Sequence, residues 1–590
     1  MSRCHFFSLS NKHKIILLLG VSLLNLQLMH HYVINVVYSQ FTGNTIEQPD
    51  PTSYFDNLFY SVIDCLTIFL FFHLISGWRI KLSLLFVNLT TISWAFSNTL
   101  YSRFFNHYIT YSVLNEYSAL KDGMVIESVI SGINLYDLTY LMSFILFIII
   151  YRNTKEKKSK LPPIRHCALI TMIMIISSIS AHIFYCISNK ETRYLKYIEK
   201  RLYKIQISSE PYLYESTLPT FDRGVIRSLL TGYFLSYQVS IKLTSSQLES
   251  IHTAIKKSTM SLTNHKLDTK PRNVIFILVE SYMSFTSDLL INGKEITPFL
   301  NSIKNDSNVY YNGHVKPNIT IGASADGQFI YLTGLLPLRS TLTISVANKI
   351  KLIGLPKILH TKMGLYPRMI IPTAESIWNQ RQMCTQYGIP TLYSRSDVKE
   401  VNKSMLSDEQ VFNLAKKIDN ENTSPFFSII LTASMHEPYN KDIDPEFSIQ
   451  DPSYKNDLKH YLNACHYTDK QIKEYFDFLK DNGIYDKSLI IIASDHNVKN
   501  ANWANISNDL PLYIINGDIN NSNSWKGQCN QVDIYTTLLD ILGIKQQWNG
   551  LGNSLLSRFY KNSLTPNKWI ISENIMRSNY LEKGLKSENR

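Results

Sequence analysis

Cysteine is scarce in this chain and shows no regular arrangement. The 590 residues contain seven cysteines, without a CxxC pair. This usage excludes a disulfide framework and a zinc ribbon. Only Cys384, Cys465 and Cys529 lie in the second half, and three cysteines can form at most one bridge there. Internal repeats and low-complexity segments are absent as well.

The positive charge is not concentrated in one place. The formal net charge is +12, but the basic residues form neither one basic face nor a recognisable binding motif, so we expect no nucleic-acid partner. The length exceeds what one hydrophobic core usually serves, so two or more domains are expected. The mean hydropathy of −0.08 averages two unlike halves, because residues 1–186 hold nearly all the long apolar runs.

Five apolar segments in residues 1–186 predict a transmembrane domain of five helices. The predicted spans are 15–36, 57–77, 82–101, 133–151 and 166–186. Each is near the ~20 residues that cross a hydrocarbon core. Lys and Arg gather before the first span, at 79–81 and at 152–165, whereas the loop 37–56 has neither. The N-terminus is therefore predicted inside and everything after residue 186 outside.

The rest of the chain alternates strand-like and helix-like segments. Residues 187–270 are expected to be a juxtamembrane connector, with a helix in ETRYLKYIEKRLYKI that is either on the membrane surface or a solvated linker. The alternation over residues 271–560 predicts an α/β domain whose mainly parallel sheet is covered on both faces. Residues 561–590 are expected to form a C-terminal tail. Asp64 lies inside the second span, where it has either a functional role or a structural one, as a polar contact between spans.

Two strand-like runs end in side chains that can bind a metal. NVIFILV at 273–279 is followed by Glu280, and LIIIAS at 489–494 is followed by Asp495 and His496. In open α/β sheets, chemistry collects at the carboxyl ends of the strands. Carboxylates and an imidazole at such an edge predict a metal site, and a metal site indicates an enzyme.

The order of the motifs resembles a known family. The series NVIFILVES, TPFL, GASADGQF, TGLLPL, SIWNQ, LTASMHEPY, CHYTDKQIKEYFDFLK, ASDHN and QVDIYTTLLDILGI, after five spans, is similar to the lipoteichoic acid synthase-like branch of the sulfatase and alkaline phosphatase superfamily. The resemblance implies a multi-pass enzyme of the bacterial plasma (inner) membrane with an extracytoplasmic catalytic domain. It would move phosphoglycerol or phosphoethanolamine from a membrane phospholipid donor to a glycan or glycolipid acceptor of the envelope.

The resemblance also assigns the central residues. Aligning TGLLPL places Ser324 at the position of the nucleophile, where it would carry a covalent intermediate and bind the metal with Glu280, Asp495 and His496. One divalent ion is expected, with Mn²⁺ first and Mg²⁺ or Zn²⁺ as alternatives. From the residues alone, Ser324 could instead cap a helix, and Gly322 and Gly327 could simply shape a turn.

Trp378, His436 and Arg381 are the expected substrate-binding residues, the first two because they match positions that face the head group in the family. The chain departs from the family pattern at two positions. Gln380 stands where Arg is frequent, with Arg381 next in line, and Ala323 stands where a basic residue often precedes the nucleophile. Both departures remove charge that would bind phosphate.

Two other classes of function compete with a transferase. In a hydrolase, a phosphodiesterase or a sulfatase, water would accept the transferred group. Formylglycine sulfatases need Arg four residues after the modified residue, and Gln328 stands there in this chain, so this type is not expected. A membrane protein whose outer domain only binds is the third class, and retention of all four metal-centre residue types argues against it.

Overall fold

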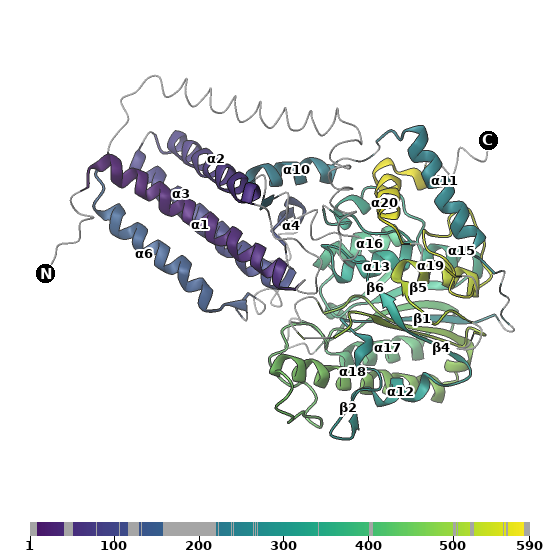
Figure 1. The fold of residues 1–590 in the computed structure, drawn as a ribbon. Helices are drawn as coiled ribbons and strands as arrows, with labels where there is room; N and C mark the ends of the chain where they lie inside the picture. Colours follow the sequence, from purple (N-terminus) through teal and green to yellow (C-terminus); the bar gives the residue numbers. More distant parts are fainter. Residues whose placement is uncertain are drawn as a thin grey trace. The chain divides into compact units, whose positions relative to one another are not determined.

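The computed structural model describes residues 9–40, 51–156 and 220–582, apart from residues 116–128 and shorter gaps within these ranges. The chain divides into two compact units. One contains Met1–Leu114 and Val129–Leu235, and the other contains Asn115–Ser128 and Ser236–Arg590. The first unit is helical and the second is an α/β domain (Figure 1).

Among the described residues of the first unit, four helices are long and apolar enough to cross a membrane. They include the segments Asn11–Val36, Tyr54–Ile75, Ile80–Phe105 and Leu135–Arg152. The first three segments lie in α1 (Asn11–Gln40), α2 (Pro51–Ile75) and α3 (Ile80–Phe105). The fourth consists of the short η3 (Leu135–Asp137) and of α6 (Leu138–Arg152), which follows it directly. These four segments confirm four of the five predicted spans. The fifth, at 166–186, and the helix expected at 191–205 lie outside the described residues.

The buried Asp64 of α2 has a structural partner in the same unit. Its carboxylate accepts a hydrogen bond of 2.7 Å from the backbone N–H of Val225, where α10 (Val225–Tyr237) begins. The first N–H groups of a helix have no partner within the helix, and here a side chain of a neighbouring helix supplies one. Of the two interpretations of Asp64, the contact favours polar packing between helices.

An eight-stranded, mainly parallel sheet forms the centre of the second unit, in the order β10-β4-β9-β8-β1-β7-β5-β6. The strands are β1 (Asn273–Val279), β4 (Val309–Lys316), β5 (Tyr366–Ile370), β6 (Thr391–Tyr393), β7 (Phe426–Leu431), β8 (Ser488–Ser494), β9 (Leu510–Ile515) and β10 (Cys529–Asn530). Strand β9 runs antiparallel to both of its neighbours, and the other pairs are parallel. A separate two-stranded ribbon consists of β2 (Leu290–Ile291) and β3 (Lys294–Glu295).

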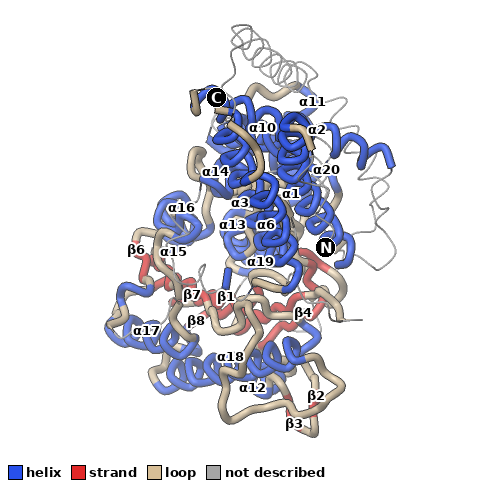
Figure 2. The backbone as a smooth tube through the Cα atoms, turned by 90° about the vertical axis from the view of Figure 1, so that its left-hand side faces the viewer, coloured by secondary structure: helices blue, strands red, loops and turns tan. Residues whose placement is uncertain are grey.

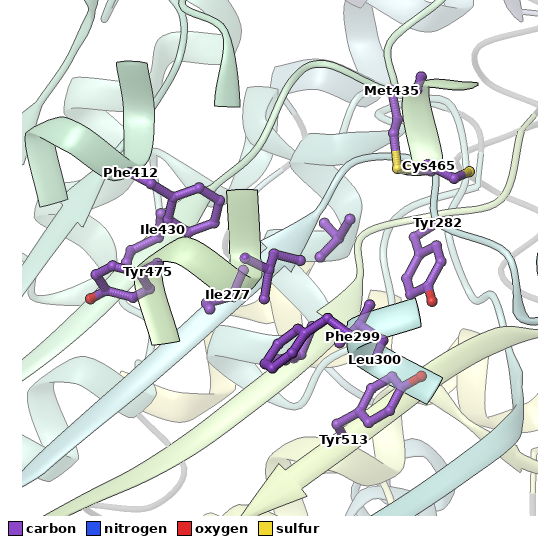
Figure 3. Packing of buried hydrophobic residues seen from close by; sticks show 14 of the residues in the cluster. Ile277, Tyr282, Phe299, Leu300, Phe412, Ile430, Met435, Cys465, Tyr475 and Tyr513 are labelled. Carbon is purple, nitrogen blue, oxygen red and sulfur yellow. The ribbon is translucent and has the colours of Figure 1, made fainter. Parts of the chain in front are cut away.

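Helices cover both faces of this sheet, as predicted (Figure 2). One face carries α12 (Pro298–Ile303), α17 (Asp408–Glu421) and α18 (Asn456–Asp481). The other carries α13 (Ser324–Thr333), α15 (Leu355–Met363), α16 (Gln380–Tyr387) and α19 (Gln531–Ile541). Because both faces are covered, every residue of β1 is buried, which explains its unbroken apolar run. Figure 3 shows the packing on the first face, where Ile277 and Ile430 of the sheet belong to one cluster with Phe299, Phe412 and Tyr475 of the helices.

Further helices complete the second unit. They are α11 (Ser245–Met260), α14 (Ile344–Ala347) and α20 (Pro566–Ser578). Helix α20 packs within this unit, since the hydroxyl of Ser572 donates to the carbonyl oxygen of Leu336 at 2.6 Å. The expected limits of connector, catalytic domain and tail remain predictions. Cys384, Cys465 and Cys529 are buried free thiols, so the one bridge that three cysteines would allow is not formed among them.

Candidate functional site

Three potential metal ligands meet at the carboxyl edge of the sheet. Glu280 follows β1, and Asp495 and His496 follow β8, the strand beside it. The two strands pair in parallel up to Val279 and Ser494, so the next residues of each emerge at the same level. One ligand atom from each of the three side chains lies within 4.8 Å of the others. The sequence prediction that these residues share a site therefore agrees with their geometry.

The polar atoms that converge here suit a cation. Nδ1 of the buried His496 lies 2.8 Å from the carbonyl oxygen of Asn497, an acceptor, so Nδ1 carries the proton of the neutral ring. Nε2 then presents a lone pair, 3.4 Å from Oε1 of Glu280 and 3.6 Å from Oδ2 of Asp495. A metal-binding histidine typically holds its other ring nitrogen in such a bond. The donor set of two carboxylates and one imidazole fits a divalent metal ion.

The two carboxylates differ electrostatically. Burial, together with repulsion from Glu280, raises the pKa of Asp495 to about 7. Burial also acts to raise the pKa of Glu280, but the positive charges that His496 and His436 carry when protonated, together with side-chain hydrogen bonds from Ser281 and Asp495, lower it. Two carboxylates side by side in a buried site resist simultaneous ionisation. A divalent cation between them would offset both charges.

Ser324 brings a hydroxyl to the same place. Its Oγ donates to Oε2 of Glu280 at 3.2 Å and lies 3.1 Å from Nε2 of His496. Ser324 is the first residue of α13 and does not cap it, because the N-cap position belongs to Ala323. Two nearby hydroxyls that could compete with Ser324 as nucleophile are engaged elsewhere: Thr320 donates to Asp326 and Thr333 to the carbonyl oxygen of Phe329, both at 2.6 Å.

The loop before Ser324 is held by a buried carboxylate that the sequence analysis did not single out. Asp326 accepts hydrogen bonds from the backbone N–H groups of Thr320 at 2.8 Å and Gly322 at 2.9 Å, and from the hydroxyl of Thr343 at 2.9 Å. Burial raises the pKa of Asp326. These bonds support Ala323, whose φ of 47° is costly for a residue with a Cβ. In the sequence, the sign of this supporting role is the position of Asp326 itself, an acidic residue two places after Ser324.

Two further contacts attach α13 and α19 to the metal-ligand segment. Gly327 lies within α13, not in a turn, and a Cβ there would be 2.4 Å from the carbonyl oxygen of Asp495. Gln531, at the start of α19, donates to the same carbonyl oxygen at 2.7 Å and accepts from the backbone N–H of Asn318 at 2.6 Å. No local pattern indicates the role of Gln531, because its partners are distant along the chain.

Trp378 lies in η5 (Ile377–Asn379), after β5, and His436 lies in the loop after β7, at the same edge of the sheet. Nδ1 of His436 lies 2.6 Å from the carbonyl oxygen of Glu437. Trp378 and Asn379 both have left-handed backbones, with φ of 53° and 50°. Strain of this kind persists where surrounding contacts over-determine the backbone, as at binding sites.

Arg381 and Gln380 are engaged with other residues. Nε of the exposed Arg381 donates to Glu375 at 2.8 Å, which holds its guanidinium in an ion pair. Gln380 is buried, and its amide donates to the side-chain oxygen of Gln328 at 3.0 Å. The expectation that Arg381 binds the substrate therefore rests on the family resemblance alone. Gln380 connects α16 to α13.

Comparison with known proteins adds two family matches. Residues 272–544 match the sulfatase family model, and residues 3–203 match the model of the lipoteichoic acid synthase N-terminal domain. Lipoteichoic acid synthase 2 of Bacillus subtilis (strain 168) is 26% identical over 313 residues, which are 49% of this chain and 48% of that protein. Lipoteichoic acid synthase of Staphylococcus aureus (strain USA300) is 25% identical over 491 residues, which are 76% of this chain and 70% of that protein. The chain thus spans about half the length of the first relative.

A solved structure is similar to part of this chain. The lipoteichoic acid synthase LtaP from Listeria monocytogenes superposes with a TM-score of 0.45 and 20% identity. The superposition covers 52% of this chain and 81% of that one.

Proposed function

The chain belongs to the lipoteichoic acid synthase-like branch of the sulfatase superfamily, and we propose that it transfers a phospholipid head group to an acceptor of the cell envelope. The donor would supply phosphoglycerol or phosphoethanolamine. The acceptor would be a glycan or a glycolipid. One observation carries the proposal: the hydroxyl of Ser324 lies within 3.2 Å of both Glu280 and His496, at a cluster that also contains Asp495.

Glu280, Asp495, His496 and Ser324 would hold one divalent metal ion. Carboxylate and hydroxyl oxygens with one imidazole suit Mn²⁺ or Mg²⁺, and Zn²⁺ is also compatible. When bound, the ion supplies Lewis-acid polarisation of the phosphoryl group and favours the ionised form of the Ser324 hydroxyl. The buried carboxylates supply the charge that holds such an ion in place.

Two displacement steps would complete the reaction. In the first, the hydroxyl of Ser324 gives its proton to water, Oγ attacks phosphorus and forms a bond to it, and the bond from phosphorus to the diacylglycerol oxygen breaks. His436 in its imidazolium form could protonate the departing oxygen through Nε2, because Nδ1 is held by Glu437. In the second step, a hydroxyl of the acceptor attacks the same phosphorus and releases Ser324 with its proton restored. Trp378 and Arg381 would contact the head group.

The proposed location follows from the helices of the first unit. The chain would sit in the bacterial plasma (inner) membrane, with the catalytic unit on the outer side. Its donor lipid lies in the same membrane, so a multi-pass anchor keeps the enzyme beside its substrate. The charge asymmetry of the loops supports this orientation.

Hydrolysis is the competing reaction, because water could replace the acceptor in the second step. The decisive experiment incubates the purified full-length protein with phosphatidylglycerol or phosphatidylethanolamine labelled in the head group. Transfer predicts release of diacylglycerol with the label on a glycan or glycolipid acceptor. Free labelled head-group phosphate, in the presence of acceptor, would establish a hydrolase instead.

A matched pair of serine substitutions distinguishes loss of the proposed nucleophile from a general effect of removing a hydroxyl. Ser324→Ala should abolish diacylglycerol release. Ser302→Ala should not, because the Ser302 hydroxyl only donates to the carbonyl oxygen of Phe299 within α12. If neither lipid releases diacylglycerol in the unaltered protein, the head-group transferase proposal is wrong for these donors.

A further inference from the structure

Ser281 contacts all three potential metal ligands. Its hydroxyl donates to Oε1 of Glu280 at 2.8 Å and lies 3.4 Å from Nδ1 of His496. Its backbone N–H donates to Oδ1 of Asp495 at 2.9 Å. We propose that Ser281 is a positioning residue that sets the affinity and the selectivity of the metal site. This inference rests on the metal site of the proposed function.

The contacts of Ser281 divide the oxygens of each carboxylate into two kinds. Oε1 of Glu280 accepts the Ser281 hydroxyl, and Oε2 faces the hydroxyl of Ser324. Oδ1 of Asp495 accepts the N–H groups of Ser281 and His496, at 2.9 and 2.7 Å, and Oδ2 is the oxygen nearer Nε2 of His496. Ser281 therefore hydrogen-bonds one oxygen of each carboxylate: Oδ1 of Asp495, and Oε1 of Glu280, which is also the oxygen 3.4 Å from Nε2 of His496.

The turn that contains Ser281 is fixed by side chains from several elements. The backbone N–H of Glu280 donates to the hydroxyl of Thr432 at 3.0 Å, and that of Tyr282 to the hydroxyl of Ser494 at 2.9 Å. The hydroxyl of Tyr461, on α18, donates to the carbonyl oxygen of Ser281 at 2.9 Å.

These bonds hold Ser281 at a φ of 50°, a left-handed conformation that a residue with a Cβ rarely adopts. The side chain is buried, so its position is set before any ligand arrives. Strain of this type is maintained only where the surrounding contacts over-determine the backbone.

The division of the oxygens has a consequence for metal choice. A cation bound through both oxygens of Glu280 or Asp495 would compete with the hydrogen bond from Ser281, so these bonds favour binding through one oxygen of each carboxylate. Ca²⁺ takes six to eight oxygen ligands and often binds carboxylates through both oxygens, whereas Mg²⁺ takes six at shorter distances. Ser281 thus favours a small divalent ion over Ca²⁺.

The test measures Mn²⁺ and Ca²⁺ binding to the purified full-length protein by titration calorimetry, without substrate. The informative variant is Ser281→Gly, which keeps the N–H bond to Asp495, tolerates the φ of 50° and removes only the hydroxyl. We expect Mn²⁺ affinity to fall by about 10- to 100-fold, as for other residues that orient metal ligands. We also expect Ca²⁺ affinity to fall less, because Glu280 could then bind through both oxygens.

The controls keep the outcomes distinct. Ser284→Ala removes a hydroxyl three residues along, one with no hydrogen-bond partner among the described residues, and should leave both affinities unchanged. Glu280→Gln should lose Mn²⁺ binding. If Glu280→Gln loses binding and Ser281→Gly binds both ions like the unaltered protein, the role of Ser281 is wrong and the metal site stands. If Glu280→Gln binds Mn²⁺ fully, the metal site and this inference both fail.

Discussion

Gly327 of α13 packs so closely on Asp495 that a Cβ at this position would lie 2.4 Å from the carbonyl oxygen of Asp495. This contact brings the first turn of α13 onto the end of β8. Ser324 is three residues earlier on the same helix, and its hydroxyl reaches Nε2 of His496 at 3.1 Å. The distance between the hydroxyl of Ser324 and the proposed metal ligands therefore depends on a residue without a side chain.

Gly327→Ala should disrupt this contact. The added methyl group must displace either α13 or the segment at Asp495, and overpacking of this kind costs about 1–3 kcal/mol of stability. We expect diacylglycerol release to fall by at least about tenfold, since each 1.4 kcal/mol of transition-state stabilisation corresponds to a factor of ten. Lipid turnover and thermal unfolding of the full-length variant measure the two effects.

Gly517→Ala is the matched control for this substitution. Gly517 follows β9 at the opposite edge of the sheet, and a Cβ there would meet side-chain atoms at 3.3 Å or more. It should keep activity close to that of the unaltered protein. Full turnover by Gly327→Ala would show that the close approach to Asp495 does not set the position of Ser324.

The strand-end residues of the site could be predicted because the signals are local. Glu280 and the pair Asp495 and His496 each follow an apolar run, and parallel neighbouring strands bring such positions together. The supporting contacts could not be predicted. Ser281 depends on a left-handed turn, Gln531 bridges segments that are distant along the chain, and neither leaves a periodic pattern.

The same contrast applies to the fold. The alternation of strands and helices predicted a covered, mainly parallel sheet, but not the reversed direction of β9, because direction depends on the connections between strands. Thr297 holds the N-cap position of α12, without a side-chain hydrogen bond to the helix. The hydrogen bonds at that end come from elsewhere: Asp469 of α18 accepts the N–H groups of Phe299 and Leu300, both at 2.9 Å.

Asp469 should make stability depend on pH. Burial raises its pKa from 3.8 to about 7, with a contribution from Glu295. The folded state therefore binds the proton more tightly than the unfolded state. The stabilisation is full below about pH 4 and is lost as the pH rises to 7, and a shift of this size corresponds to about 4 kcal/mol.

Asp469→Asn has no proton to release, so its stability should fall less between pH 4 and pH 7 than that of the unaltered protein. The measurement is the midpoint of thermal unfolding of the full-length protein across this range. Asp477→Asn, at an exposed position of the same helix that pairs with Lys473, should keep the original pH dependence. Equal pH dependence in Asp469→Asn and the unaltered protein would contradict the prediction.

The predicted orientation can be tested with reporter fusions. A reporter placed after residue 158, in the basic segment that follows the fourth span, should behave as cytoplasmic. One placed after residue 260, at the end of α11, should behave as extracytoplasmic. A further fusion within 37–56, the loop without Lys or Arg, should also report the outer side. Finding the fusions after 158 and 260 on the same side would overturn the five-span prediction.

The covalent intermediate on Ser324 is the most direct prediction of the proposed mechanism. A membrane lipid and a bulky acceptor meet with difficulty in one complex at the bilayer surface. A two-step route avoids this meeting, because diacylglycerol leaves before the acceptor arrives. Enzyme incubated with donor lipid and no acceptor should therefore carry the head-group phosphate on the peptide that contains Ser324, as measured by mass spectrometry.

Substitutions at this residue then separate chemistry from folding. Ser324→Ala should carry no adduct and release no diacylglycerol, while unfolding at nearly the original temperature, because its hydroxyl faces the site and does not cap α13. Ser324→Thr should keep part of the activity, since it retains a hydroxyl at the same position. Thr333→Ser provides the comparison, as the hydroxyl of Thr333 is committed to the carbonyl oxygen of Phe329. An adduct on Thr320 or Thr333 would move the nucleophile, and a fully active Ser324→Ala would exclude covalent catalysis at Ser324.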